Sequence, residues 1–134
     1  MITNTENQAL SFEKKIEIFS KRSYEIRKAG GTCPVQDLLA PSVEKWSLFC
    51  IYNLAYNKKL RFGQLKNYIP KISSRMLSVT LKKLEHNNMV KRKVYAEVPP
   101  KVEYSLTEFG HEYAKRLIDL NLWLIENNPQ TMKS

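Results

Sequence analysis

The 134-residue sequence has few of the features that mark enzymes. It contains two cysteines, two histidines and four glycines. His86 and His111 have no Cys/His cluster beside them, and no GxSxG, P-loop or GxGxxG motif occurs. Glu108 and Glu112 are spaced i,i+4 on an expected helix, where carboxylates are ordinarily solvated surface groups. We therefore expect no enzyme activity, no cofactor and no metal site.

The sequence also lacks the features of membrane-spanning and exported chains. No apolar run approaches the roughly 18 residues that a spanning helix needs. The stretch MITNTENQALSFEKK has neither a basic start nor an apolar signal core. Two cysteines without disulfide-type spacing fit a reducing compartment. The expectation is a cytoplasmic protein without a membrane partner.

Positive charge is plentiful and unevenly distributed. The chain has a formal net charge of +9. Residues 58–101 carry twelve Lys/Arg and two Asp/Glu, a net charge of +10, whereas residues 1–57 and 102–134 carry +1 and −2. Charge concentrated in one third of a chain is typical of a face that binds a polyanion. Nucleic acid is the first candidate and an anionic membrane the second, although solvated surface also produces such blocks.

Hydrophobic periodicity predicts a mainly helical fold. Apolar residues recur at helical spacing in segments 11–31, 42–57, 60–70, 73–90 and 106–128, and Pro34 is expected to open a short helix over 34–40. Ser42 is the expected N-cap of the helix that follows, and Thr107 that of the last helix. The length fits one domain, 1–134, made of an N-terminal helix in 1–31, a core in 33–106 and a C-terminal helix in 107–128.

The segment SSRMLSVTLKKLEHNNMV predicts a helix with two different faces. At 100° per residue, Leu77, Leu81 and Leu84 share an aliphatic face opposite a polar and basic one. An ordinary surface helix would usually mix acidic residues into the polar face. Small hydroxyls and basic groups instead suit a helix that enters the DNA major groove. The predicted contacts are Ser73, Ser74, Arg75, Ser78, Val79 and Lys82, with either serine as N-cap.

The segment RKVYAEVPPKVEYSL predicts a β-hairpin. Apolar and polar residues alternate on both sides of Pro99-Pro100, and proline is expected at the tip because it cannot donate to a strand ladder. Val90 and Val94 are expected on the buried face. Arg92 has the same parity, and we expect it to extend toward solvent or to pair with Glu103 or Glu108.

The order of these elements is that of a winged helix. A helix-turn-helix with a three-residue turn precedes the basic hairpin, so the fold class is mainly α with a small β-hairpin wing. The stiff proline tip lowers the entropy lost when the wing meets DNA. The predicted contacts outside the recognition helix are Arg61, Lys91, Lys93 and Lys101.

The first and last helices exceed what a minimal winged helix needs. Their apolar stripes are expected to pack on each other or on a second subunit. The predicted homodimer interface comprises Phe12, Ile16, Phe19, Leu117, Leu120, Trp123 and Leu124.

Several segments resemble the HxlR-type winged-helix regulators, relatives of the MarR group. They are CPVQDLLAPSVEKWSLFCIYNL, LRFGQLKNYIPKISSRMLSVTLKKLE and VKRKVYAEVPPKVEYSLTEFG, within Cys33 to Trp123. The resemblance implies a cytoplasmic homodimer that binds an inverted-repeat operator in double-stranded DNA. Repression is the expected mode, because no segment looks like a polymerase-contacting activation region. The long segment 1–30 departs from the family pattern and leaves the dimer geometry open.

The resemblance extends to Cys33, which in several members senses quinones, aldehydes or oxidants. A thiol just before a helix can have a lowered pKa, although a small structural residue would also suit this position. Cys50 is expected in the core. The alternative to an operator-binding regulator is a winged-helix module that contacts RNA or protein, and a membrane-surface role is disfavoured because the basic block includes strands and turns.

Overall fold

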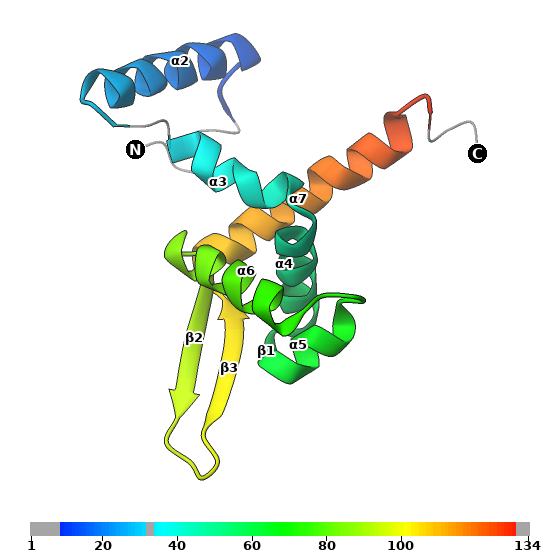
Figure 1. Ribbon diagram of the computed structural model, residues 1–134. Helices are drawn as coiled ribbons and strands as arrows, with labels where there is room; N and C mark the ends of the chain where they lie inside the picture. The colour runs from blue at the N-terminus through cyan, green and yellow to red at the C-terminus, as the bar shows by residue number, and fades with distance from the viewer. Residues whose placement is uncertain (1–8, 32–33, 131–134) are drawn as a thin grey trace. The chain divides into compact units, whose positions relative to one another are not determined.

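The computed structural model describes residues 9–31 and 34–130 (Figure 1). It divides into two compact units, residues 1–38 and residues 39–134, which are described one at a time. In chain order the elements are α2 (Phe12–Lys28), α3 (Pro34–Val43), α4 (Lys45–Asn57), β1 (Lys59–Arg61), α5 (Phe62–Tyr68), α6 (Ser74–His86), β2 (Val90–Tyr95), β3 (Lys101–Leu106) and α7 (Glu108–Asn127).

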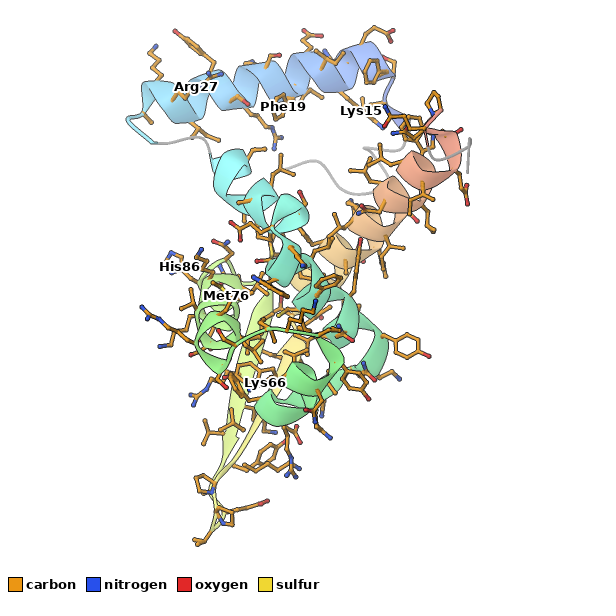
Figure 2. All side chains as sticks on the ribbon, turned by 45° about the vertical axis from the view of Figure 1, so that its right-hand side comes forward. Lys15, Phe19, Arg27, Lys66, Met76 and His86 are labelled. Carbon is orange, nitrogen blue, oxygen red and sulfur yellow. The ribbon has the colours of Figure 1, made fainter. Side chains whose placement is uncertain are left out.

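The first unit contains the amphipathic helix α2. Ser11 caps it, because the hydroxyl accepts a hydrogen bond from the Lys14 amide at 3.2 Å. The helix ends before Gly30, whose φ of +86° lies in the left-handed region that glycine adopts easily. Phe12 and Phe19 are 72% and 55% exposed, so the predicted apolar stripe is not covered within this unit. Figure 2 shows the side chain of Phe19 on α2.

The second unit contains a three-stranded antiparallel sheet with the order β1-β3-β2. The predicted hairpin is confirmed, with Arg92 opposite Tyr104 and Tyr95 opposite Lys101, and it projects away from the helices (Figure 1). The strand β1 was not predicted. It is only three residues long, and its pairing of Leu60 with Tyr104 depends on a partner that is distant in sequence.

The core of this unit lies between α4, α6, α7 and the sheet. It is built from fully buried aliphatic residues at helical spacing, among them Ile51 and Leu54 of α4 and Leu77, Leu81 and Leu84 of α6. Gly110 allows the first turn of α7 to lie against the loop between α6 and β2, since a Cβ there would collide with the Met89 carbonyl oxygen. The same packing fixes the position of the hairpin beside α6.

Two local predictions around residue 42 are wrong. The helix α3 does not stop at residue 40 but continues through Pro41 to Val43. Ser42 therefore lies inside α3, where its hydroxyl donates to the Leu39 carbonyl at 2.6 Å. The N-cap of α4 is Glu44, which has extended backbone angles. Pro41 lies in the last turn of α3, where it has no amide hydrogen to donate to the carbonyl four residues earlier.

The architecture is a mainly helical winged helix-turn-helix. The elements α5 and α6 form the helix-turn-helix, and β2 and β3 form the wing. The turn spans residues 69–73 and is longer than the predicted three residues, because α5 ends at Tyr68 and Lys71 takes a φ of +67°. The predicted fold class is confirmed.

Candidate nucleic-acid interface

The helix α6 places its polar residues on one surface because its aliphatic residues are held in the core. Ser73 is the N-cap, and its hydroxyl accepts a hydrogen bond from the Met76 amide at 3.0 Å. Leu77 and Leu84 are 0% exposed. Thr80 is also buried, and its hydroxyl donates to the Met76 carbonyl at 2.7 Å. The orientation of the helix about its own axis is therefore fixed.

The predicted contact residues of α6 lie on this outer surface. Ser73, Ser74, Arg75, Val79 and Lys82 are exposed, and Ser78 is half-buried. Figure 2 shows Met76 and His86 of the same helix carrying side chains into solvent. Neither Arg75 nor Lys82 forms an ion pair within residues 9–31 and 34–130. Their positive charges are thus available to an external anion.

Arg61 lies at the junction of β1 and α5. It is exposed, and its backbone amide donates to the Gln64 side-chain oxygen at 2.9 Å, which satisfies a free group at the helix start. β1 pairs Arg61 with Glu103 of the central strand β3. The short strand thus fixes the start of the helix-turn-helix to the base of the wing.

The predicted lysines of the wing are in unequal environments. Lys101 forms an ion pair with Glu103 at 2.9 Å, and the Tyr95 hydroxyl donates to the same carboxylate at 3.0 Å. The hydrogen bond from Lys101, helped by that from Tyr95, lowers the pKa of Glu103. The ammonium groups of Lys93 and Lys101 each lie 4.9 Å from the centre of the Tyr95 ring. Lys91 is exposed, and within residues 9–31 and 34–130 it forms no ion pair and lies over no aromatic ring.

One prediction about β2 is wrong, and one of the two alternatives for Arg92 is excluded. Val94 is 54% exposed and not buried, because the hairpin extends past the helices (Figure 1). Arg92 does not pair with Glu103 or Glu108, since Glu103 is already bound to Lys101 and Tyr95. Arg92 is exposed, in agreement with the other alternative, and it also lines a cleft beside α6.

We call this hollow the helix–wing cleft. It encloses about 320 Å³ between α6 and the base of the wing, and its lining residues are Ser78, Leu81, Lys82, Glu85, Arg92 and Tyr104. The sequence contained one signal for this cleft. Arg92 points to the same face of its strand as the apolar residues Val90 and Val94, which is unusual for an arginine. Parity alone did not show that α6 would supply a lysine and a glutamate to the same cleft.

A second hollow, of about 640 Å³, lies between α4 and α7 and has a different chemistry. Its lining contains no charged residue and consists of Tyr52, Asn53, Ala55, Tyr56, Ile118, Asn121, Leu122 and Ile125. It therefore offers no charge to a phosphate backbone. Around the α7 axis, Ile118 and Ile125 lie about 100° and 80° from Leu117, on a different face from the predicted dimer stripe.

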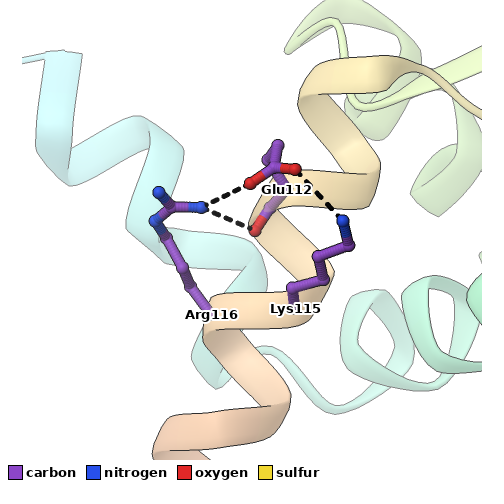
Figure 3. A network of polar contacts seen from close by, with 3 residues as sticks. All are labelled: Glu112, Lys115 and Arg116. Carbon is purple, nitrogen blue, oxygen red and sulfur yellow. Dashed lines mark hydrogen bonds and ion pairs between the residues drawn. The ribbon is translucent and has the colours of Figure 1, made fainter. Parts of the chain in front are cut away.

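The predicted dimer stripe of α7 is only partly on the surface. Leu120, Trp123 and Leu124 are 53%, 60% and 44% exposed, whereas Leu117 is 5% exposed. Leu117 belongs to the core of its own unit, so its assignment to an interface is corrected. The outer surface of the first half of α7 carries an ion-pair network, in which Glu112 binds Arg116 at 2.8 Å and Lys115 at 3.2 Å (Figure 3).

The structure describes one of the two cysteines, Cys50, and not the other. Cys50 is 0% exposed in α4, and burial raises the pKa of its thiol to about 12, in agreement with its expected place in the core. Cys33 lies outside the described residues. Within residues 9–31 and 34–130, no group of three or more His, Cys, Asp or Glu side chains could hold a metal ion. No helix of those residues is long and apolar enough to cross a membrane.

A capped recognition helix beside a basic β-hairpin defines a DNA-binding winged helix-turn-helix protein. The family model for HxlR-like helix-turn-helix proteins matches residues 43–132. The chain therefore belongs to the HxlR-like helix-turn-helix family of transcriptional regulators, which is not a family of enzymes.

Individual relatives agree with this assignment. The HTH-type transcriptional regulator YdeP of Bacillus subtilis (strain 168) is 42% identical over 91 residues, which cover 68% of this chain and 70% of YdeP. The redox regulator HypR in its reduced form is 36% identical, with a TM-score of 0.65 over 75% of this chain and 99% of HypR. Diamide-treated YodB from B. subtilis is 31% identical, with a TM-score of 0.63 over 72% of this chain and 95% of YodB.

Proposed function

We propose that this regulator binds an inverted-repeat operator in duplex DNA as a homodimer and represses the adjacent genes in the cytoplasm. The observation that carries the proposal is the outer surface of α6, where Arg75 and Lys82 are exposed without ion pairs in the described chain. Ser74 and Ser78 are short and leave room for a helix to approach base edges.

The homodimer is supported by apolar surface on two helices. Phe12 and Phe19 of α2 and Leu120 and Trp123 of α7 are each more than half exposed. Large apolar side chains clustered on a surface mark protein contacts. A dimer would also place two recognition helices about one helical turn, ~34 Å, apart, as two half-sites require.

A redox or electrophile signal through Cys33 is the proposed control. Two similar solved structures are described as a redox regulator and as a diamide-treated form, and diamide oxidises thiols. Cys33 immediately precedes the first residue of α3 in the sequence, where a helix start favours a thiolate. Cys50 is a poor alternative, because its pKa of about 12 leaves almost no thiolate at neutral pH.

A gel shift on the region upstream of the protein's own gene tests operator binding. If each subunit neutralises ~3–5 phosphates, the slope of log affinity against log salt should lie roughly between −5 and −9 for the dimer. A slope near zero, or binding of RNA in preference to duplex DNA, would contradict the proposal and favour a winged-helix module with another partner.

A quinone or hypochlorite titration of the DNA complex tests the signal. Wild type and Cys50→Ser should release DNA, and Cys33→Ser should retain it. If Cys33→Ser responds as wild type does, sensing through Cys33 is wrong and the DNA-binding proposal still stands.

A further inference from the structure

The helix–wing cleft has no assigned role, although it contains two cationic side chains from different elements. Arg92 comes from β2 and Lys82 from α6, and both line the same 320 Å³ hollow. Neither forms an ion pair within the described residues. Both residues are exposed, so a solvent anion can reach them, and an anion between the two cations would be stabilised from both sides.

The alternation of side chains along β2 and its register with β3 place the Arg92 side chain on the face toward α6. Side chains alternate along a strand, and the neighbours of Arg92 at spacing two are Val90, which is buried, and Val94. Opposite Arg92, the register places Tyr104 of β3, which lines the same cleft. Lys91 and Lys93 point to the other face of the sheet, where Lys93 lies over the Tyr95 ring.

The cleft lies along one edge of the outer surface of α6. Taking Arg75 as zero, Lys82, Ser78 and Glu85 lie at about 340°, 300° and 280° around the helix axis, on the side of the wing. Arg75 and Val79 lie at about 0° and 40°, further from the wing. Arg75 is also seven residues before Lys82, about 10 Å along the helix. The two basic residues of α6 therefore face different parts of a bound duplex.

We propose that the helix–wing cleft receives one phosphate of the DNA backbone, held by Arg92 and Lys82 in each subunit. The planar guanidinium of Arg92 can donate two parallel hydrogen bonds to phosphate oxygens, and the Lys82 ammonium acts as a second, compact charge. This inference rests on the proposed DNA binding and assigns different roles to the basic residues. Arg75, at the start of α6, reads base edges, whereas the Arg92–Lys82 pair positions the duplex without reading sequence.

Glu85 should act against the two cations, by weakening the binding of a phosphate in the same cleft. Its carboxylate lines the same cleft and has no ion-pair partner in the described chain. A negative charge beside a bound phosphate lowers affinity, so Glu85 limits how tightly the cleft holds DNA. Glu85→Gln keeps the shape of the side chain and removes its charge.

The experiment measures binding by fluorescence anisotropy over a range of salt concentrations. The probes are a duplex from the upstream region of the protein's own gene and a short duplex of random sequence. Arg92→Ala should weaken binding to both duplexes by roughly tenfold to hundredfold. It should also reduce the magnitude of the salt slope by at most about 1.8, since each dimer has two such phosphates and Lys82 still contacts each of them.

Three further variants test the geometry. Lys91→Ala removes the same charge from the neighbouring position on the opposite face of β2, and it should have a smaller effect than Arg92→Ala. Arg92→Lys should restore the salt slope but only part of the affinity, because lysine cannot form the bidentate contact. Glu85→Gln should tighten binding to both duplexes by about two- to fivefold.

The outcomes separate this inference from the proposed function. If wild type binds neither duplex, operator binding itself is wrong. If wild type binds and Arg92→Ala keeps the wild-type affinity and salt slope, the phosphate site is wrong and the proposed function stands. If Arg92→Ala keeps the slope but changes preference at one base pair, Arg92 reads a base and the proposal is overturned. A thermal unfolding curve for each variant excludes loss of fold as the cause.

Discussion

The helices α6 and α7 are built by the same local rules and end with different surfaces. Each is capped by a hydroxyl that accepts a hydrogen bond from the amide three residues later, in Ser73 to Met76 and in Thr107 to Gly110. Each buries aliphatic residues at helical spacing. The polar edge of α6 is basic, whereas the second half of α7 exposes Leu120, Leu122, Trp123, Leu124 and Ile125.

The difference indicates two kinds of partner. A basic surface with short hydroxyl side chains matches the phosphates and base edges of DNA. Large exposed apolar side chains gain free energy only when another apolar surface covers them. The first half of α7 is anchored in the unit by Ala114 and Leu117, which are 2% and 5% exposed. The exposed second half is therefore the part of a fixed helix that the proposed second subunit would cover.

The largest expected effect distinguishes the buried face of α6 from the exposed face of α7. Leu84→Ala should lower the free energy of unfolding by about 2–5 kcal/mol at every protein concentration, because it leaves a cavity in the core. Leu120→Ala should cost less, and its cost should depend on protein concentration, because half-exposed Leu120 would be covered only in the proposed dimer. Urea unfolding at two protein concentrations measures both. Equal, concentration-independent losses would contradict the comparison.

The next effect concerns how α7 is anchored. Gly110→Ala should destabilise the fold by about 1–3 kcal/mol or more, since the new Cβ would meet the Met89 carbonyl oxygen and force the start of α7 to move. Gly63→Ala is the matched control. Apart from its own helix backbone and chain neighbours, a Cβ at Gly63 would meet no described atom within 4 Å, so alanine in α5 should stabilise by about 0.5–1 kcal/mol. Thermal unfolding of both variants tests whether Gly110 lies as close to the Met89 carbonyl oxygen as the structure shows.

Replacing Trp123 of α7 by a charge should break the dimer while leaving DNA-facing residues in place. Trp123 is 60% exposed, and its burial between subunits should contribute about 1.5–3 kcal/mol per side chain. Trp123→Glu should therefore shift the protein from dimer to monomer in sedimentation at micromolar concentration. Tyr56→Glu is a control at an exposed aromatic residue of α4, outside the predicted stripe. A wild-type protein that sediments as a monomer would refute the role given to α7.

The smallest expected effects separate the two basic residues of α6. Arg75→Ala should reduce discrimination by about 1–3 kcal/mol at one base pair of each half-site, because it removes a contact to a base edge. Lys82→Ala should weaken binding evenly across operator variants and reduce the salt slope. Competition assays with single-base operator variants measure the two patterns. Unchanged binding in both variants would mean that α6 is not the recognition helix.

Much of the fold could be predicted because the relevant signals are local. Ser73 and Thr107 cap the helices they were expected to cap, and Pro99-Pro100 lies at the hairpin tip. The buried leucines of α6 follow from their spacing alone. Ser42 was misjudged because a serine before an apolar stretch has the same local signature whether a helix begins there or continues past it.

The sequence by itself determined the helix faces, the hairpin and the concentration of positive charge, because these depend on residues within one or two turns of one another. Only the tertiary structure decided which charges are free. It pairs Lys101 with Glu103, exposes Val94 beyond the helices, and places Arg92 beside Lys82 and Glu85 of a helix that precedes it in the chain. Such pairings depend on how separate elements pack, since alternation along a strand specifies a direction for each side chain but not what lies there.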